Sequence, residues 1–247
     1  MRNIRLTIEY DGSRYQGWQR LGGTSNQNTI QGKLEAVLSK MTGEDIKIVG
    51  SGRTDAGVHA YGQTANFHTD TFFSCQEIRE YLMTYLPTDI GILKAEEAGE
   101  RFHSRLNAKS KTYLYRIGIP GESHVFERKY LWQFPEVLDL NRMNEAANYY
   151  IGSHDFKGFS SIKKTKKSTV REIYDVSVKQ LDREIQISYT GNGFLHNMVR
   201  ILTGTLVEIG RGTMEPEDIL TVYQTKDRKK AGITAPPQGL FLVNVTY

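Results

Sequence analysis

The sequence contains very little cysteine and no long apolar segment. Its 247 residues include a single cysteine, Cys75, which cannot form a disulfide within the chain and so favours a reducing compartment. One cysteine also disfavours a thiolate metal site, which needs several such ligands. No run of 18 apolar residues occurs, and the alternating start MRNIRLTIEY lacks the apolar core of a signal peptide. We therefore expect a cytoplasmic protein with no membrane span.

Negative charge is nearly in balance with positive charge, but the positive charge is clustered. The formal net charge is only +4, yet lysine and arginine concentrate in KKTKK, residues 163–167, and in KDRKK, residues 226–230. Such runs are commonly solvated loops. Alternatively, lysines of this kind neutralise phosphates and release condensed counterions. Both interpretations of the two basic runs remain open at this point.

Hydrophobic spacing predicts two α+β halves with the same order of elements. In the first half we expect strands near 3–10, 46–49, 62–68 and 89–95 and helices at 28–43 and 74–87, the second opening with a capping box of Ser74 and Glu77. In the second half we expect strands at 111–119, 172–180, 184–189 and 240–247 and helices at 139–152, 194–212 and 214–226. Apart from one extra helix, both halves follow the ferredoxin-like order β-α-β-β-α-β.

The duplicated order predicts an α+β fold in which strands of both halves face a shared cleft. The boundary is expected in the polar stretch 100–110, giving an N-terminal half of residues 1–105 and a C-terminal half of residues 106–247. No low-complexity linker separates them, so we expect the halves to pack together.

Common catalytic motifs are mostly missing. GSGRTDAG contains G-x-G, but no Lys-Ser/Thr ending and no helical pattern follows, which argues against a phosphate-binding loop. His154 and Asp155 in SHDF suggest a metal pair, but the six histidines show no ligand spacing around them. A local cap or core contact is the favoured role for these two residues. No serine lies in a nucleophile-elbow pattern, so conventional hydrolase and metal mechanisms are disfavoured.

The stretch SGRTDAGVHA, residues 51–60, places Asp55 among small residues. The ordinary explanation is a turn aspartate that bonds its own backbone. The alternative is a nucleophile or base, because the small neighbours leave room for a bulky ligand and Arg53 supplies a cation. A buried nucleophilic carboxylate must stay ionised and needs a cationic partner. Arg200, on the helix flank opposite a leucine stripe, is one candidate. These residues alone do not choose between the two explanations.

A series of longer motifs resembles the tRNA pseudouridine synthase A family, the TruA type. The likeness extends over nearly the whole chain, and GRTDAGVHA is its most specific part. In order, the matching segments are YDGSRYQGWQR, GRTDAGVHAYGQTANF, LPTDI, KTYLYRI, HDFKGFSS, STVREI, NGFLHNMVRILTGTLVEIGRG and GLFLVNVTY.

This resemblance implies an isomerase that converts uridine to pseudouridine at positions 38, 39 and 40 of the tRNA anticodon stem-loop. It implies a homodimer without cofactor or metal, whose two halves form one mixed, mainly antiparallel sheet with a central active-site cleft flanked by helices. Asp55 matches the family's nucleophilic aspartate and Tyr113 its substrate-stacking tyrosine. Arg53 matches an arginine that helps to hold the everted site, and Arg200 one that pairs with the aspartate.

The chemistry fits these residue types. The reaction breaks the C1′–N1 bond, rotates the freed uracil and rejoins it through C5, so it needs no redox step. The carboxylate attacks C1′ or C6, or removes a sugar proton, and the sequence does not choose among the three. The target base has to be flipped out of its stack, where Tyr113 can hold it; the alternative is that Tyr113 is a core tyrosine.

Three other functions remain as alternatives: a related synthase with another RNA target, a non-catalytic RNA-binding module, or a glycosidase. The last would need a second carboxylate.

Overall fold

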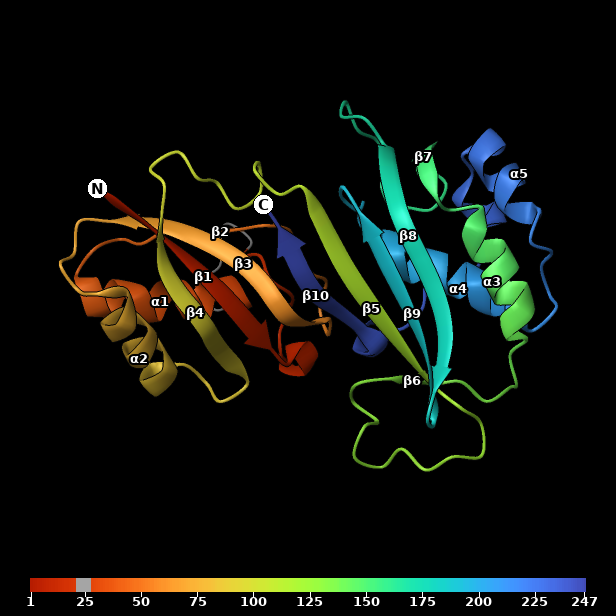
Figure 1. Cartoon of the computed structure of the whole chain (residues 1–247), viewed down its shortest axis with the longest axis horizontal. Helices are drawn as coiled ribbons and strands as arrows, with labels where there is room; N and C mark the ends of the chain where they lie inside the picture. Colours follow the sequence, from red (N-terminus) through yellow and green to blue (C-terminus); the bar gives the residue numbers. More distant parts are fainter. Residues whose placement is uncertain (21–27) are drawn as a thin grey trace. The chain divides into compact units, whose positions relative to one another are not determined.

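The computed structural model describes residues 1–20 and 28–247, which divide into two compact units (Figure 1). Unit 1 comprises Met1–Lys109 together with Phe241–Tyr247, and unit 2 comprises Ser110–Leu240. The sequence-based division placed the whole of residues 106–247 in the second half. In the structure the last strand clusters with unit 1 instead, because it pairs with a strand of that unit.

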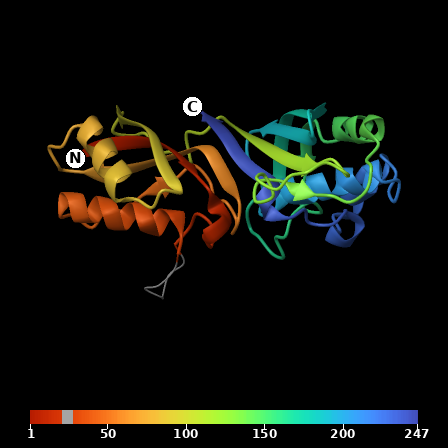
Figure 2. The same ribbon diagram turned by 90° about the horizontal axis from the view of Figure 1, so that it is seen from below.

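Unit 1 is built on four adjacent strands in the order β4-β1-β3-β10. Both neighbours of β1 are antiparallel to it, whereas β10 is parallel to β3 and the short β2 is antiparallel to β3. Helix α1 lies along one face of these strands (Figure 2), and α2 packs beside α1 and β4. The elements are β1 (Arg2–Tyr10), α1 (Ile30–Thr42), β2 (Val49–Gly50), β3 (His59–Thr69), α2 (Cys75–Tyr85), β4 (Ile90–Ala98) and β10 (Leu240–Thr246).

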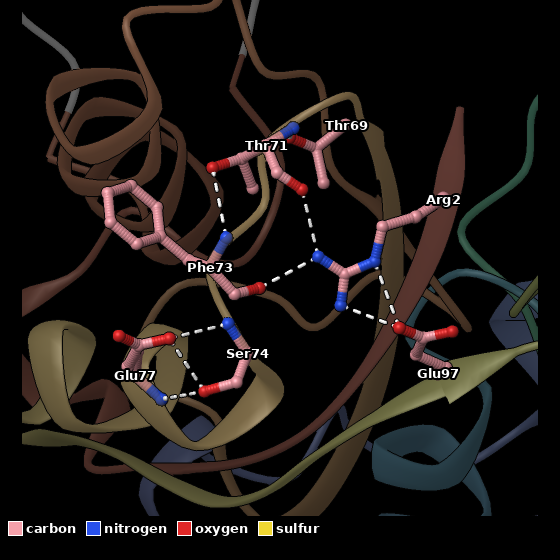
Figure 3. A network of polar contacts seen from close by, with 7 residues as sticks. All are labelled: Arg2, Thr69, Thr71, Phe73, Ser74, Glu77 and Glu97. Atoms are coloured by element: carbon pink, nitrogen blue, oxygen red, sulfur yellow. Dashed lines mark hydrogen bonds and ion pairs between the residues drawn. The ribbon is translucent and has the colours of Figure 1, made fainter.

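The start of α2 shows why local sequence determined this helix so well. Ser74 Oγ accepts a hydrogen bond from the Glu77 N–H (3.2 Å), and Glu77 Oε2 accepts one from the Ser74 N–H (2.7 Å), which confirms the predicted capping box (Figure 3). Arg2 of β1 donates to two carbonyl groups of the loop before the helix and pairs with Glu97 of β4. The cap is therefore tied to two strands of unit 1.

Unit 2 contains four antiparallel strands in the order β5-β9-β8-β7, with the short β6 parallel to β5. Nearly every residue of α4 is buried; the exceptions are Arg200 and Glu208. The elements are β5 (Ser110–Gly118), β6 (Trp132–Gln133), α3 (Leu140–Asn148), β7 (Gly152–Asp155), β8 (Val170–Leu181), β9 (Glu184–Gly191), α4 (Met198–Gly210) and α5 (Asp218–Thr225).

The predicted α+β class with mainly antiparallel strands is confirmed, and unit 1 follows the order β-α-β-β-α-β. Two helix starts were wrong: the helix expected from Met214 begins at Asp218, and the helix expected from Phe194 begins at Met198. Asn197 before it has a φ of 59°, a left-handed conformation that cannot continue a right-handed helix. None of the helices in the described ranges has the length and apolar character needed to cross a membrane.

Candidate active site

Asp55 lies in a loop of unit 1, residues 51–58, between β2 and β3. The Val58 N–H donates to the Asp55 carbonyl oxygen (3.2 Å) and closes a four-residue turn. Gly57, third in this turn, has a φ of 78°, a conformation that glycine adopts without a steric penalty. Asp55 is half-buried and Arg53 is exposed.

Thr54 anchors this loop to other residues of unit 1. It is 7% exposed, and its Oγ1 shares a hydrogen bond with the Tyr10 hydroxyl (2.8 Å). Its carbonyl oxygen accepts from the Trp18 N–H (3.0 Å). Thr54 is therefore buried between the exposed Arg53 and the half-buried Asp55.

A second segment, residues 11–18, packs backbone to backbone against the Asp55 loop. A Cβ on Gly12 would overlap the Val58 carbonyl oxygen, and a Cβ on Gly17 would lie 2.6 Å from the Thr54 carbonyl oxygen. Gly17 also has a φ of 93°. The motifs YDGSRYQGW and GRTDAGVHA are thus one structural unit in which glycine is required at both contacts.

The exit of the Asp55 loop is held by His59, which is 1% exposed. Its Nδ1 accepts from the Gly12 N–H (3.1 Å) and lies 3.1 Å from Asp11 Oδ1. Its ring stacks on Phe241 of β10, with the centroids 4.7 Å apart. The LPTDI motif joins the same region, because the Asp11 N–H donates to the carbonyl oxygen of Asp89 (3.0 Å). These motifs are visible in the sequence, but they do not indicate that Thr54, His59 and the two glycines support the loop.

In unit 2, Tyr113 lies on β5 opposite Tyr189 of β9. It is 7% exposed and packs edge-on against Phe194, with the ring centroids 5.1 Å apart. Tyr115, two residues on, is fully buried and donates to the Pro236 carbonyl oxygen (2.7 Å). Burial raises the pKa of Tyr115 well above its ordinary value, while the nearby Arg200 guanidinium acts to lower it. Phe194 was not among the predicted site residues.

Arg200 projects from the first turn of α4. Its Nε donates to the Ala235 carbonyl oxygen (2.7 Å) and its Nη1 to Asn197 Oδ1 (3.0 Å). The Arg200 carbonyl oxygen in turn accepts from the Ala235 N–H (3.0 Å), so backbone and side chain are both fixed. Arg53 and Asp55 therefore share one loop of unit 1, and Tyr113 and Arg200 belong to unit 2. The pairing of Asp55 with Arg200 stays a prediction.

His154 and Asp155 have the local roles predicted for them. The His154 ring stacks on Tyr223 at 4.6 Å between centroids, and its Nε2 bonds the Ile151 carbonyl oxygen (2.9 Å). Asp155 accepts from Lys157 N–H and pairs with Lys226. Across residues 1–20 and 28–247, no group of three or more His, Cys, Asp or Glu side chains is placed to hold a metal ion.

Comparison with known proteins defines the class of enzyme. A sequence model described as tRNA pseudouridine synthase matches residues 6–107 and 146–247, which include the Asp55 loop and α4. The chain is 47% identical to tRNA pseudouridine synthase A 2 of Bacillus cereus and to tRNA pseudouridine synthase A of a Bacillus species (strain KSM-64). It is 44% identical to tRNA pseudouridine synthase A of Caldicellulosiruptor bescii, and all three comparisons cover the whole of both chains. The chain belongs to the tRNA pseudouridine synthase A family, which is a family of isomerases.

Proposed function

We propose that this tRNA pseudouridine synthase modifies uridines 38, 39 and 40 of the anticodon stem-loop and that Asp55 is its catalytic carboxylate. The observation that carries the proposal is the presentation of Asp55. A buried threonine anchors the loop, Gly12 and Gly17 let a neighbouring segment pack closely against it, and Asp55 is half-buried two residues from the exposed Arg53. The surrounding motif lies within the matched family region.

The isomerisation balances without a co-reactant. The C1′–N1 bond breaks, a C1′–C5 bond forms, the C5 proton leaves and N1 gains a proton. Asp55 attacks C1′ or C6, or takes a proton from the sugar. We assign Tyr113 to stacking on the flipped uracil, since its ring is fixed edge-on by Phe194 and base flipping exposes a face for stacking. We further propose that Arg53 contacts the everted nucleotide and that Arg200 supplies the counter-charge for Asp55.

The decisive experiment replaces Asp55 by Asn, which keeps the size of the side chain but removes the charge and the nucleophilic oxygen. Turnover, measured by tritium release from C5-labelled tRNA transcripts, is expected to fall by more than about a hundredfold. The dissociation constant of tRNA, measured by filter binding, is expected to stay within about tenfold of the wild-type value, roughly 1.4 kcal/mol.

Asp45→Asn is the matched control, because Asp45 is an exposed aspartate of the same unit that pairs only with the exposed Lys47 among the described residues. It should leave turnover unchanged. If the Asp55→Asn enzyme kept its turnover, the catalytic role of Asp55 would be refuted. If this variant lost both tRNA binding and its folded structure, the role of Asp55 would be to shape its turn.

The target positions and the assembly have their own tests. Transcripts in which uridines 38, 39 and 40 are replaced by cytidine should release no tritium, whereas each single uridine restored should regain release. Persistent release would indicate another RNA target. Sedimentation should give a homodimer, and we place the enzyme in the cytoplasm with tRNA as its partner.

A further inference from the structure

A loop of unit 2, residues 161–168, carries four lysines with no acidic residue among them. It leads from β7 into β8, and Figure 1 shows the chain that enters β8 projecting past the end of that strand. We call it the basic loop. All four ammonium-bearing side chains are exposed, and within residues 1–20 and 28–247 none of them forms an ion pair. They are Lys163, Lys164, Lys166 and Lys167.

The second basic run differs in its surroundings, because it contains Asp227 and further acidic residues lie beside it. Lys226 pairs with Asp155 (2.7 Å), and Arg228 donates to the carbonyl oxygen of Gly232 (2.8 Å). Lys229 and Lys230 line a surface pocket of about 460 Å³ whose lining includes the carboxylates Glu208 and Asp218. The two runs look alike in sequence, but the second has acidic side chains among and beside its basic residues, whereas the basic loop contains none.

The base of the basic loop is closed by hydrogen bonds. The Phe156 N–H donates to the Thr169 carbonyl oxygen (3.1 Å), and Thr169 Oγ1 donates to Asp155 Oδ1 (2.6 Å). Arg171 adds a further bond from its Nη1 to the Ser168 carbonyl oxygen (3.1 Å). The loop therefore starts and ends at a fixed point of unit 2.

The basic loop is also bonded to the residues that hold Arg200. The Ser161 N–H donates to the carbonyl oxygen of His196 (3.1 Å), and Asn197 Nδ2 donates to Ser161 Oγ (2.8 Å). The other side-chain atom of Asn197, Oδ1, accepts from Arg200 (3.0 Å). One asparagine therefore joins the loop to a candidate site residue.

Strand pairing places Tyr113 at the same end of the unit. Gly191, the last residue of β9, lies opposite Ile173 near the start of β8 and opposite Lys111 near the start of β5. Tyr113 is two residues beyond Lys111 on β5. The basic loop, Arg200 and Tyr113 thus all lie where β5 and β8 begin.

We propose that the basic loop is a phosphate-binding arm for the RNA substrate. The inference rests on the proposed function, because its partner is the RNA that Asp55 acts on. Uncompensated lysines neutralise backbone phosphates and release counterions, which adds affinity without reading sequence. The arm therefore acts on binding of the RNA and leaves the chemical step unchanged.

The test compares two lysine pairs of the same unit with the same spacing. The double variant Lys163→Gln/Lys164→Gln is set against Lys229→Gln/Lys230→Gln, which removes two exposed lysines from the second basic run. The dissociation constant of tRNA is measured between about 50 and 200 mM salt. We expect the first variant to weaken binding several-fold and to flatten the dependence of log Kd on log salt by roughly one to two units, and the second to match the wild type.

Two further measurements make the outcome specific. Replacing all four lysines of the basic loop by arginine should preserve affinity, and the single-turnover rate at saturating tRNA should be unchanged in every variant. The proposed role of the basic loop would be refuted if log Kd depended on log salt equally in the two double variants. It would also be refuted if the basic-loop variant lost its single-turnover rate while its Kd was unchanged. If the wild-type enzyme bound tRNA but released no tritium, the proposed function would be refuted. The dependence of log Kd on log salt would still show whether the basic loop binds phosphates.

Discussion

Gly17 meets the Asp55 loop at a point where no side chain fits. Its φ of 93° is a glycine conformation, and a Cβ there would lie 2.6 Å from the Thr54 carbonyl oxygen. Backbone overlap of this kind cannot be relieved by a rotamer change. A substitution at Gly17 therefore has to move Thr54, and Asp55 moves with it.

We expect Gly17→Ala to lower the free energy of unfolding by about 1–3 kcal/mol and to lower turnover at least about tenfold. Gly99→Ala is the control, since Gly99 has nothing within 4 Å of its Cβ position and should leave both quantities nearly unchanged. Thermal unfolding and tritium release provide the two readouts. A stable Gly17→Ala enzyme with full turnover would show that the close approach is not needed for activity.

For single residues, the sequence predicts a role for Asp55 and Arg53 but does not indicate which residues support their loop. Small neighbours and the resemblance both directed attention to the loop. The bond from Tyr10 to Thr54 joins residues that are 44 apart in the chain, and nothing in the local pattern of either residue indicates its partner. The glycines at positions 12 and 17 were visible as letters, but their function depends on a backbone that lies against them only in the folded chain.

Among the elements, the junction of β7 and β8 depends on one carboxylate. Asp155 accepts hydrogen bonds from Thr169 and from the Lys157 N–H and pairs with Lys226. Partial burial acts to raise the pKa of Asp155, but the interactions with Lys226, Thr169 and Lys157 outweigh it, and the pKa lies below its ordinary value. A carboxyl group that binds its proton less readily when folded stabilises the fold above its unfolded pKa of about 3.9.

Asp155→Asn should therefore destabilise the protein near neutral pH, by about 1–3 kcal/mol for the lost charged hydrogen bonds. The difference from the wild type should shrink as the pH falls through and below about 4, because the wild-type carboxyl then becomes protonated. Urea unfolding at several pH values measures this. Asp182→Asn, at an exposed aspartate of the β8–β9 turn, should show no such convergence. A constant difference at all pH values would rule out the ionised carboxylate as the cause.

Elements with strong local signals were predicted and those without were not. The capping box located α2, and alternation located β1 and β5. The strand β7 has the sequence GSHD, with no apolar alternation, and β6 spans only two residues. Such strands form because a neighbouring strand offers hydrogen bonds. The late start of α4 likewise depends on Asn197, whose left-handed conformation is stabilised by contacts with Ser161 and Arg200.

For the molecule as a whole, the main difference from expectation is the unit to which β10 belongs. A period of two correctly predicted a strand at the end of the sequence, but periodicity does not indicate which strand it pairs with. In the structure Phe241 lies opposite His59 and stacks on the rings of His59 and Tyr61, at 4.7 and 4.8 Å. Unit 1 is therefore completed by residues that follow all of unit 2.

Phe241→Ala should lower the free energy of unfolding by about 3–5 kcal/mol, the usual range for a buried phenylalanine, because Phe241 is 3% exposed. Turnover should fall as well, since the ring supports the exit of the Asp55 loop. Phe72→Ala is the matched control in the same unit, as Phe72 is fully exposed. If the two variants gave the same unfolding curves and the same tritium release, Phe241 would contribute neither to stability nor to support of the Asp55 loop.

Completion of unit 1 by β10 also has a consequence during protein synthesis. A nascent chain that has reached residue 240 already contains Arg53, Asp55, Tyr113 and Arg200, yet His59 and Tyr61 still lack the ring between them. Only when β10 is added does Phe241 join Asp11 and Gly12 in contacting His59 at the exit of the Asp55 loop. Chains that stop before β10 would thus carry every candidate site residue but lack one support of the Asp55 loop, and we expect them to be less active than chains that include β10.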